Sequence, residues 1–276
     1  MKLCYQVATP DVKIDESVTA YQGPLEESFK ELSELGYDGV ELMTLNPKEL
    51  DWAEVKNLLD KYHLVAALVC TGEIFGQLKL SYTDPDEEIR KEAIRRTKEI
   101  IDFAGYLKAD INIGRIRGQY NRSLTKKQTW NLAVDAFKEI SVYAKERNVR
   151  IALETVTIMQ TNFINTLEEG LQMVMDVNED NFRLMMDIFH LNLEEKNIYD
   201  AIRKYQAYNI HVHLADNNRR YPGHCGLDFE KIIRTLKESG YEGTYSTEIY
   251  QIPDQKTAAE ESIRHLKPIL NSIYQN

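Results

Sequence analysis

Four acidic or imidazole side chains lie late in apolar runs of the second half of the chain: Glu154 in IALET, Asp187 in LMMDIFH, His213 in HVHLAD and Glu248 in STEIY. Taken alone, each is typical of a polar strand end or a helix N-cap. Successive members are about one strand–helix unit apart, so we expect them to surround one cavity. Three carboxylates aimed at one point repel each other in a partly dry cavity, which favours a bound divalent cation.

The donor types of this set indicate which ion it prefers. Oxygen-rich ligation with one nitrogen suits Mn²⁺ or Mg²⁺, and Co²⁺ and Zn²⁺ also fit. The three cysteines, Cys4, Cys70 and Cys225, form no Cys-x-x-Cys pair, which argues against a thiolate zinc site or a disulfide framework. We therefore predict one divalent ion, with its identity left open.

The rest of the sequence predicts the elements that would position these residues. Short runs rich in Val, Ile and Leu alternate with longer amphipathic stretches, which is typical of a parallel sheet built from strand–helix units. Eight strands are predicted, at Leu3–Ala8, Asp38–Met43, Leu64–Gly72, Ala109–Gly114, Val149–Thr155, Phe182–Asp187, Asn209–Asp216 and Gly243–Tyr250. The clearest helical patterns are Pro24–Gly36, Glu87–Leu107, Ser123–Asn148, Asp228–Gly240 and Thr257–Tyr274.

Eight such units in about 250 residues favour a closed (β/α)8 barrel of the TIM type over an open doubly wound sheet. The first strand is not followed by the Gly-rich phosphate turn that an open sheet would normally have. No linker or low-complexity segment interrupts the chain, so we expect a single domain over residues 1–276.

Composition excludes several classes of partner. The 44 acidic residues outnumber the 34 basic ones, and a net charge of -10 argues against nucleic acid. No run of about 18 apolar residues and no signal-like leader is present, so we expect no membrane partner and a cytoplasmic location.

The segments IALET, MMDIFH, HVHLADNNRRYPG and YSTEIY resemble the xylose isomerase-like barrel superfamily of sugar isomerases and epimerases. The resemblance spans nearly the whole chain and is closest to the ketose 3-epimerase and sugar-phosphate epimerase branch. DGVEL, which places Glu41 at a strand end, is a weaker match. The resemblance implies the same four metal ligands that the spacing argument reached.

The resemblance also implies a reaction, in which a metal-dependent isomerase or epimerase moves a proton on a sugar or sugar phosphate through an enediolate. Glu154 and Glu248 correspond to an acid/base pair that also ligates the metal, and His190 and Arg219 to groups that hold substrate oxygens. Return of the proton to the same carbon gives epimerisation, and delivery to the adjacent carbon gives isomerisation. Both reactions need these residues, so both stay open.

Two features bear on the substrate. Many ketose epimerases of this type have a second acid six residues after the first metal ligand, where this chain has Gln160. The resemblance therefore does not identify the substrate of this protein. Arg115 and Arg117 follow the fourth predicted strand, where two guanidinium groups could clamp a sugar phosphate, with an ordinary basic loop as the equal alternative.

Three further polar residues are interpreted structurally. His211 shares the strand face of His213, so it is predicted to be a core histidine or a partner of the ligand shell. Asp216 is expected to orient His213 or Arg219. Glu73 is expected to be a solvated acid near a helix start.

Other functions remain open within the same resemblance. Abasic-site endonucleases of this superfamily use three metal ions and more histidines, whereas this chain has six His and no basic track. Inositol-derivative dehydratases and hydroxypyruvate isomerase belong to nearby branches. A barrel that only binds a sugar or a metal is the non-enzymatic alternative. Outer helices often mediate dimers in relatives, so a homo-oligomer is also left open.

Overall fold

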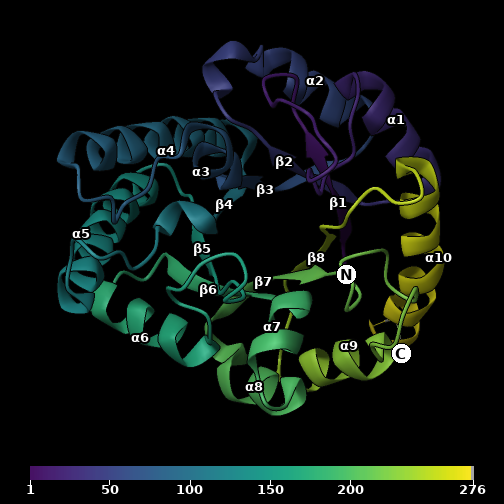
Figure 1. Cartoon of the computed structure of the whole chain (residues 1–276). Coiled ribbons are helices and arrows are strands. Elements are labelled where there is room, and N and C mark those ends of the chain that lie inside the picture. Colours follow the sequence, from purple (N-terminus) through teal and green to yellow (C-terminus); the bar gives the residue numbers. More distant parts are fainter. Residues whose placement is uncertain (275–276) are drawn as a thin grey trace.

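Eight parallel strands close into a barrel in the computed structural model, which describes residues 1–274 (Figure 1). Each strand pairs with its neighbours in chain order, and β8 returns to pair with β1. The strands are β1 (Leu3–Ala8), β2 (Gly39–Met43), β3 (Val65–Cys70), β4 (Asp110–Ile113), β5 (Ile151–Glu154), β6 (Phe182–Asp187), β7 (Asn209–Leu214) and β8 (Thr244–Thr247). The predicted (β/α)8 barrel is confirmed.

The strands β1 and β6 have their predicted bounds, and the other strands are shorter than predicted. The shortening matters at β8, because Glu248 follows the last strand residue instead of lying within the strand. Its side chain is therefore positioned by loop contacts as well as by the sheet.

An outer ring of helices surrounds the barrel (Figure 1). The α-helices are α1 (Leu25–Leu35), α2 (Trp52–Lys61), α3 (Gly72–Leu78), α4 (Glu87–Leu107), α5 (Lys126–Lys145), α6 (Leu167–Val177), α7 (Ile188–Glu194), α8 (Ile198–Tyr205), α9 (Phe229–Glu238) and α10 (Gln255–Tyr274). Single 3₁₀ turns form η1 (Pro47–Glu49), η2 (Arg115–Arg117) and η3 (Gln206–Tyr208). The helix α4 has its predicted bounds, and α1, α5 and α9 lie inside theirs.

Local sequence signals account for several helix ends. Thr125 and Thr166 form capping boxes at the starts of α5 and α6. The helix α1 ends at Gly36, whose φ of 96° lies in the left-handed region that glycine adopts without strain. Its N–H donates to the last carbonyls of the helix, which satisfies groups that would otherwise lack partners.

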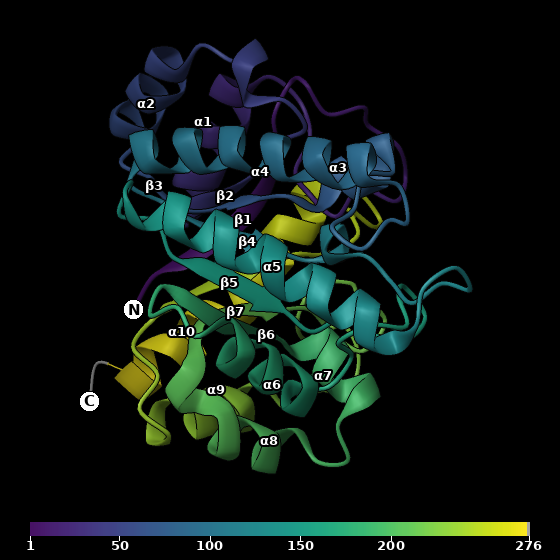
Figure 2. The same ribbon diagram turned by 90° about the vertical axis from the view of Figure 1, so that its left-hand side faces the viewer.

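The strands are buried on both faces because side chains fill the barrel and helices cover its outside. The helices α3 and α7, which follow β3 and β6, lie at one end of the barrel, and the N-terminus lies at the other (Figure 2). The C-terminal ends of the strands therefore face the end that carries α3 and α7. Within residues 1–274, no helix is both long and apolar enough to cross a membrane.

Candidate active site and metal centre

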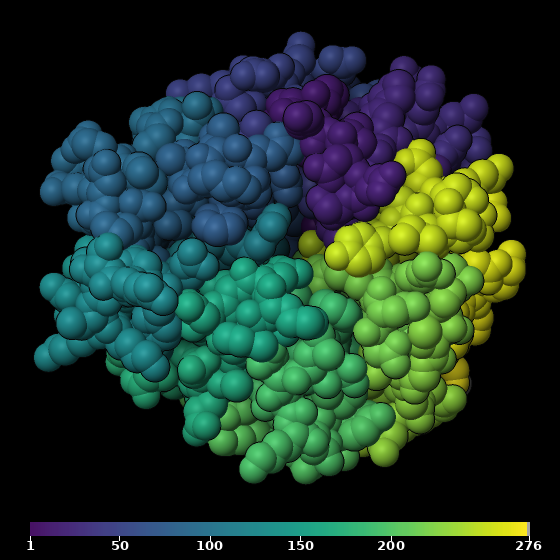
Figure 3. Space-filling model, viewed as in Figure 1, coloured from purple at the N-terminus to yellow at the C-terminus, as the bar shows by residue number. Residues whose placement is uncertain are grey.

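A cavity of about 420 Å³ opens at the C-terminal end of the barrel. Figure 3 shows this face, which is hollowed near its middle. Five of the predicted site residues line the cavity, namely Arg115, Glu154, His190, Arg219 and Glu248. A larger cavity of about 730 Å³ is lined by residues of helices and strand starts at the opposite end of the barrel, and within residues 1–274 the one imidazole in its lining is His211. The smaller cavity is therefore the candidate active site.

The four predicted metal ligands converge at this cavity. One ligand atom from each of Glu154, Asp187, His213 and Glu248 lies within 4.8 Å of the others. His213 Nδ1 is 3.0 Å from Glu248 Oε2, 3.7 Å from Glu154 Oε1 and 3.9 Å from Asp187 Oδ2. The spacing that suggested one shared site is thus matched by the side-chain geometry.

Several atoms of this group are buried without a hydrogen bond. Within residues 1–274, Glu154 Oε1, Asp187 Oδ2 and His213 Nδ1 lack hydrogen-bond partners. Buried acceptors left in this state cost about 1–3 kcal/mol each, and facing acceptors also repel one another. A divalent cation among them would satisfy all three, and oxygen donors with one imidazole nitrogen suit such an ion. The residues present therefore fit a metal centre.

Each ligand owes its position to a strand end. Glu154 is the last residue of β5, and Asp187 is the last residue of β6 and the N-cap of α7. Asp187 Oδ1 accepts the N–H groups of Phe189 and His190, which leaves Oδ2 directed to the site. Thr19 Oγ1, in the loop after β1, lies 3.1 Å from Glu248 Oε1 and 2.9 Å from Gln6 Oε1, and its one hydrogen can be donated to either oxygen. The sequence analysis missed Thr19, because this contact depends on how the first and last units of the barrel meet.

The two glutamates differ electrostatically. Burial raises the pKa of Glu154, and the neighbouring charges of Glu248 and Asp187 raise it further. Burial acts against the charge of Glu248 as well, but Arg219 and His213 hold its pKa below the ordinary value. Arg219 Nη2 lies 2.5 Å from Glu248 Oε2. In the metal-free protein, Glu154 is thus the glutamate that holds a proton more readily.

His190 lies where the resemblance placed a substrate-binding group. Its Nε2 is 3.7 Å from Asp187 Oδ2 and 3.9 Å from Glu154 Oε1. Burial lowers the pKa of His190 to about 4, against the opposing effect of Asp187. The ring is therefore neutral near pH 7.

Arg219 is held by an ordered loop. Its backbone φ of 57° is left-handed, which is unusual for a residue with a side chain. The buried carboxylate of Asp216 accepts the N–H groups of Gly223 and Cys225 at 3.1 and 2.7 Å. Asp216 thus organises this loop, and within residues 1–274 its carboxylate accepts backbone N–H groups instead of contacting the side chain of His213 or Arg219, which it was expected to orient.

The structure contradicts the prediction that Arg117 binds a sugar phosphate. This side chain is fully buried. Its guanidinium donates to the carbonyl oxygens of Gly114, Glu154, Phe163 and Ile164 at 2.8–3.0 Å. These backbone carbonyl groups take up the N–H donors of the guanidinium. Arg117 therefore links the loop after β5 to the end of β4 and cannot reach a ligand.

Arg115, by contrast, lines the cavity, as does Gln160. Arg115 Nη2 lies 3.6 Å from Oε1 of Glu73, a residue of α3. Glu73 also lines the cavity and is only 8% exposed, so the expectation of a solvated acid was wrong. Its place directly after β3 was the available signal, since strand-end residues face the mouth of such a barrel.

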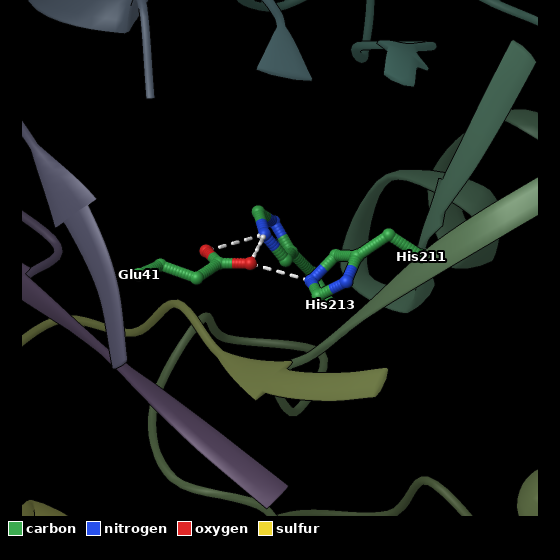
Figure 4. Close-up of side chains that lie close together, drawn as sticks. All are labelled: Glu41, His211 and His213. Atoms are coloured by element: carbon green, nitrogen blue, oxygen red, sulfur yellow. Dashed lines mark hydrogen bonds and ion pairs between the residues drawn. The ribbon is translucent and has the colours of Figure 1, made fainter. Parts of the chain in front are cut away.

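His211 lies below the ligands, as predicted, in a cluster with Glu41 and His213 (Figure 4). Burial opposes the charge of Glu41, but the two imidazoles hold its pKa below the ordinary value. The cluster places a buried carboxylate directly behind one predicted metal ligand.

Comparison with known proteins gives four findings. The family model described as xylose isomerase-like TIM barrel matches residues 29–269. A D-psicose 3-epimerase from Ruminiclostridium cellulolyticum is 30% identical over 166 residues, which span 59% of this chain but only 57% of that relative. An inosose isomerase from Halalkalibacterium halodurans is 25% identical over an alignment that covers 97% of this chain and 94% of the relative. The solved structure of a D-allulose 3-epimerase from Methylomonas sp. matches with a TM-score of 0.80 over 98% of both chains, at 21% identity.

Proposed function

The chain belongs to the xylose isomerase-like TIM barrel family, and we propose that it is a divalent-metal-dependent epimerase or isomerase of ketoses. The similarity to a D-psicose 3-epimerase and an inosose isomerase supports an enzyme that isomerises or epimerises carbohydrates. The metal requirement, the enediolate route and the residue roles are the proposed part.

One observation carries the proposal. Buried, unpartnered atoms of Glu154, Asp187 and His213 meet an oxygen of Glu248 in the floor of an open cavity. A binding site for a neutral sugar alone would not need three carboxylates at one point, since their mutual repulsion costs stability. Mn²⁺ and Mg²⁺ suit the oxygen-rich set, and Co²⁺ and Zn²⁺ suit it as well.

A divalent ion in this set would stabilise negative charge on the hydroxyl and carbonyl oxygens of a ketose, which acidifies the intervening C–H. The carboxylates of Glu154 and Glu248 come from different sides of the ligand group and can face opposite sides of a bound substrate. We assign proton removal to one and proton return to the other. His190 and Arg219, beside them, hold the substrate oxygens.

The reverse transfer uses the same two residues with their roles exchanged. Arg219 keeps Glu248 charged and therefore ready to accept a proton, whereas among residues 1–274 no Lys or Arg side chain makes a comparable contact with the Glu154 carboxylate. Removal from C3 and return to the opposite face of C3 gives an epimer, whereas removal from C1 and delivery to C2 gives an aldose. The site supports both outcomes, and the placement of the substrate carbons decides between them.

Replacement of Glu248 by Gln tests the proposal. With each divalent metal supplied in turn, the wild type should exchange deuterium from solvent into a carbon-bound position of a ketose, and Glu248→Gln should lose at least about 10²-fold of this rate. Metal content is measured in both proteins, because Glu248 is also a proposed ligand. Glu230→Gln, at an exposed site on α9, is the control. Undiminished exchange in metal-loaded Glu248→Gln would remove this residue from the mechanism.

The contacts of the arginines near the cavity determine which substrates are tested. Arg117 is unavailable and Arg115 faces Glu73, so free ketoses are tested beside ketose phosphates. An inosose, as a cyclic ketone, is included because the inosose isomerase match covers almost the whole chain.

A further inference from the structure

We propose that Glu41 is a positioning residue that fixes the tautomer of His213, so that Nδ1 faces the metal centre. This inference rests on the proposed metal site. It assigns a role to the carboxylate that contacts the outer nitrogen of His213, which is the one nitrogen ligand in the proposed set. It concerns a contact that crosses the barrel interior, since β2 and β7 are not neighbours in the sheet.

The geometry of the contact is direct. Glu41 Oε2 lies 2.9 Å and Oε1 3.2 Å from His213 Nε2. Glu41 Oε1 also lies 2.5 Å from His211 Nε2. All three residues are at most 1% exposed, and Figure 4 shows the carboxylate facing both rings.

The chemistry of a carboxylate decides the tautomer. An ionised carboxylate only accepts hydrogen bonds, so His213 Nε2, which is hydrogen-bonded to Glu41, must carry hydrogen. A neutral imidazole protonated at Nε2 has its lone pair at Nδ1. For His213 that lone pair points at Glu154, Asp187 and Glu248.

His211 contacts the same carboxylate. Its Nδ1 lies 2.8 Å from Thr244 Oγ1, and a hydroxyl can donate to it. A lone pair on Nδ1 accepts this hydrogen bond, and Nε2 faces Glu41 Oε1 in an ion-pair contact. Thr244, His211 and Glu41 thus form a continuous line of side-chain contacts that ends at His213.

The strand pairing is irregular next to Glu41 and His211. The register between β2 and β3 shifts between Val40 and Glu41, and that between β6 and β7 shifts at Leu184/Met185, where Met185 pairs with His211. Such irregularities re-aim side chains and are frequent next to active sites. The two contacts between Glu41 and His213 Nε2 are direct hydrogen bonds of 2.9 and 3.2 Å, whereas His211 Nε2 contacts Glu41 Oε1 as an ion pair. Glu41 and His213 are therefore joined directly.

The first test needs no variant. The protein is labelled with ¹⁵N-histidine and loaded with ¹¹³Cd²⁺, and the coupling between metal and ring nitrogens is recorded. The proposal predicts coupling to Nδ1 of His213 and a protonated Nε2. Coupling to Nε2 of His213, or a second ion bound by Glu41 and His211, would overturn it.

The second test removes the charge but keeps the shape of the side chain. An amide has one acceptor oxygen and an NH₂ donor, so Glu41→Gln cannot accept from both imidazoles. We expect the dissociation constant for Mn²⁺, measured by calorimetry, to rise about 10–100-fold. The same variant should lose the single His213 tautomer in the ¹⁵N spectrum.

Glu99→Gln is the matched control. Glu99 is 7% exposed and pairs with Lys48 and Arg95 on the outer helices, far from the metal ligands in the fold. We expect its Mn²⁺ affinity to equal that of the wild type. Equal loss of affinity in both variants would indicate a general effect of removing a buried charge and would refute the positioning role.

The outcomes separate this inference from the proposed function. A wild type that binds no divalent metal refutes the metal-dependent function itself. Metal binding through Nδ1 that Glu41→Gln leaves unchanged refutes only the role of Glu41. If Glu41→Gln does not fold, the wild-type coupling measurement still decides which nitrogen binds.

Discussion

A methyl group added at Gly114 should disturb the chemistry while sparing the fold. A Cβ at this position would lie 2.8 Å from Glu154 Oε2, whereas ordinary contacts begin near 3.4 Å. The Glu154 carboxylate, at the end of a flexible side chain, must therefore retreat by about 0.6 Å. Catalytic groups tolerate misplacements of only about 0.5 Å, and about 1 Å can cost about 10²-fold in rate.

We expect Gly114→Ala to reduce metal-dependent deuterium exchange into a ketose about 10- to 100-fold. The free energy of unfolding should change by about 1 kcal/mol or less, because the clash is relieved by a side-chain movement. Exchange is followed by NMR in D₂O, and stability by denaturant unfolding.

Gly72→Ala provides the control within the same cavity. Gly72 lines the site, but a Cβ there would have no atom within 4 Å. Its exchange rate should match that of the wild type. Full activity in Gly114→Ala, or an equal loss in Gly72→Ala, would refute the claim that the position of Glu154 is critical.

Three other substitutions test neighbouring contacts. Arg117→Met should lower the free energy of unfolding by about 3 kcal/mol, because it leaves four buried carbonyl groups without their donor; equal stability in denaturant would contradict this role. Thr19→Val should slow exchange about tenfold, through loss of about 1.5 kcal/mol of hydrogen bonding to Glu248, and an unchanged kcat would exclude the contact from positioning. Asp216→Ala should raise KM more than it lowers kcat, because the loop that holds Arg219 loses its acceptor; steady-state kinetics that show the opposite split would reject this assignment.

The barrel and the convergence of the four proposed ligands could be predicted because they depend on periodic signals. Apolar runs mark the strands, and a polar residue late in such a run must lie at one mouth of a closed parallel sheet. Glu154, Asp187 and His213 illustrate the rule. Glu248 follows it less closely, since β8 ends one residue before it.

The contacts that the sequence did not reveal join segments far apart in the chain. Arg117 looked like a ligand-binding arginine because it follows β4, but the loop after β5 covers it with carbonyl groups. Glu41 meets His211 and His213 only through the closure of the barrel. Neither outcome leaves a local pattern, because neither depends on periodicity.

The most direct test of the metal centre is anomalous diffraction from crystals grown with Mn²⁺. We predict one anomalous peak bonded to Glu154 Oε1, Asp187 Oδ2, His213 Nδ1 and a carboxylate oxygen of Glu248. An absence of density at that point under saturating Mn²⁺, or a peak bonded instead to Glu41 and His211, would contradict the account.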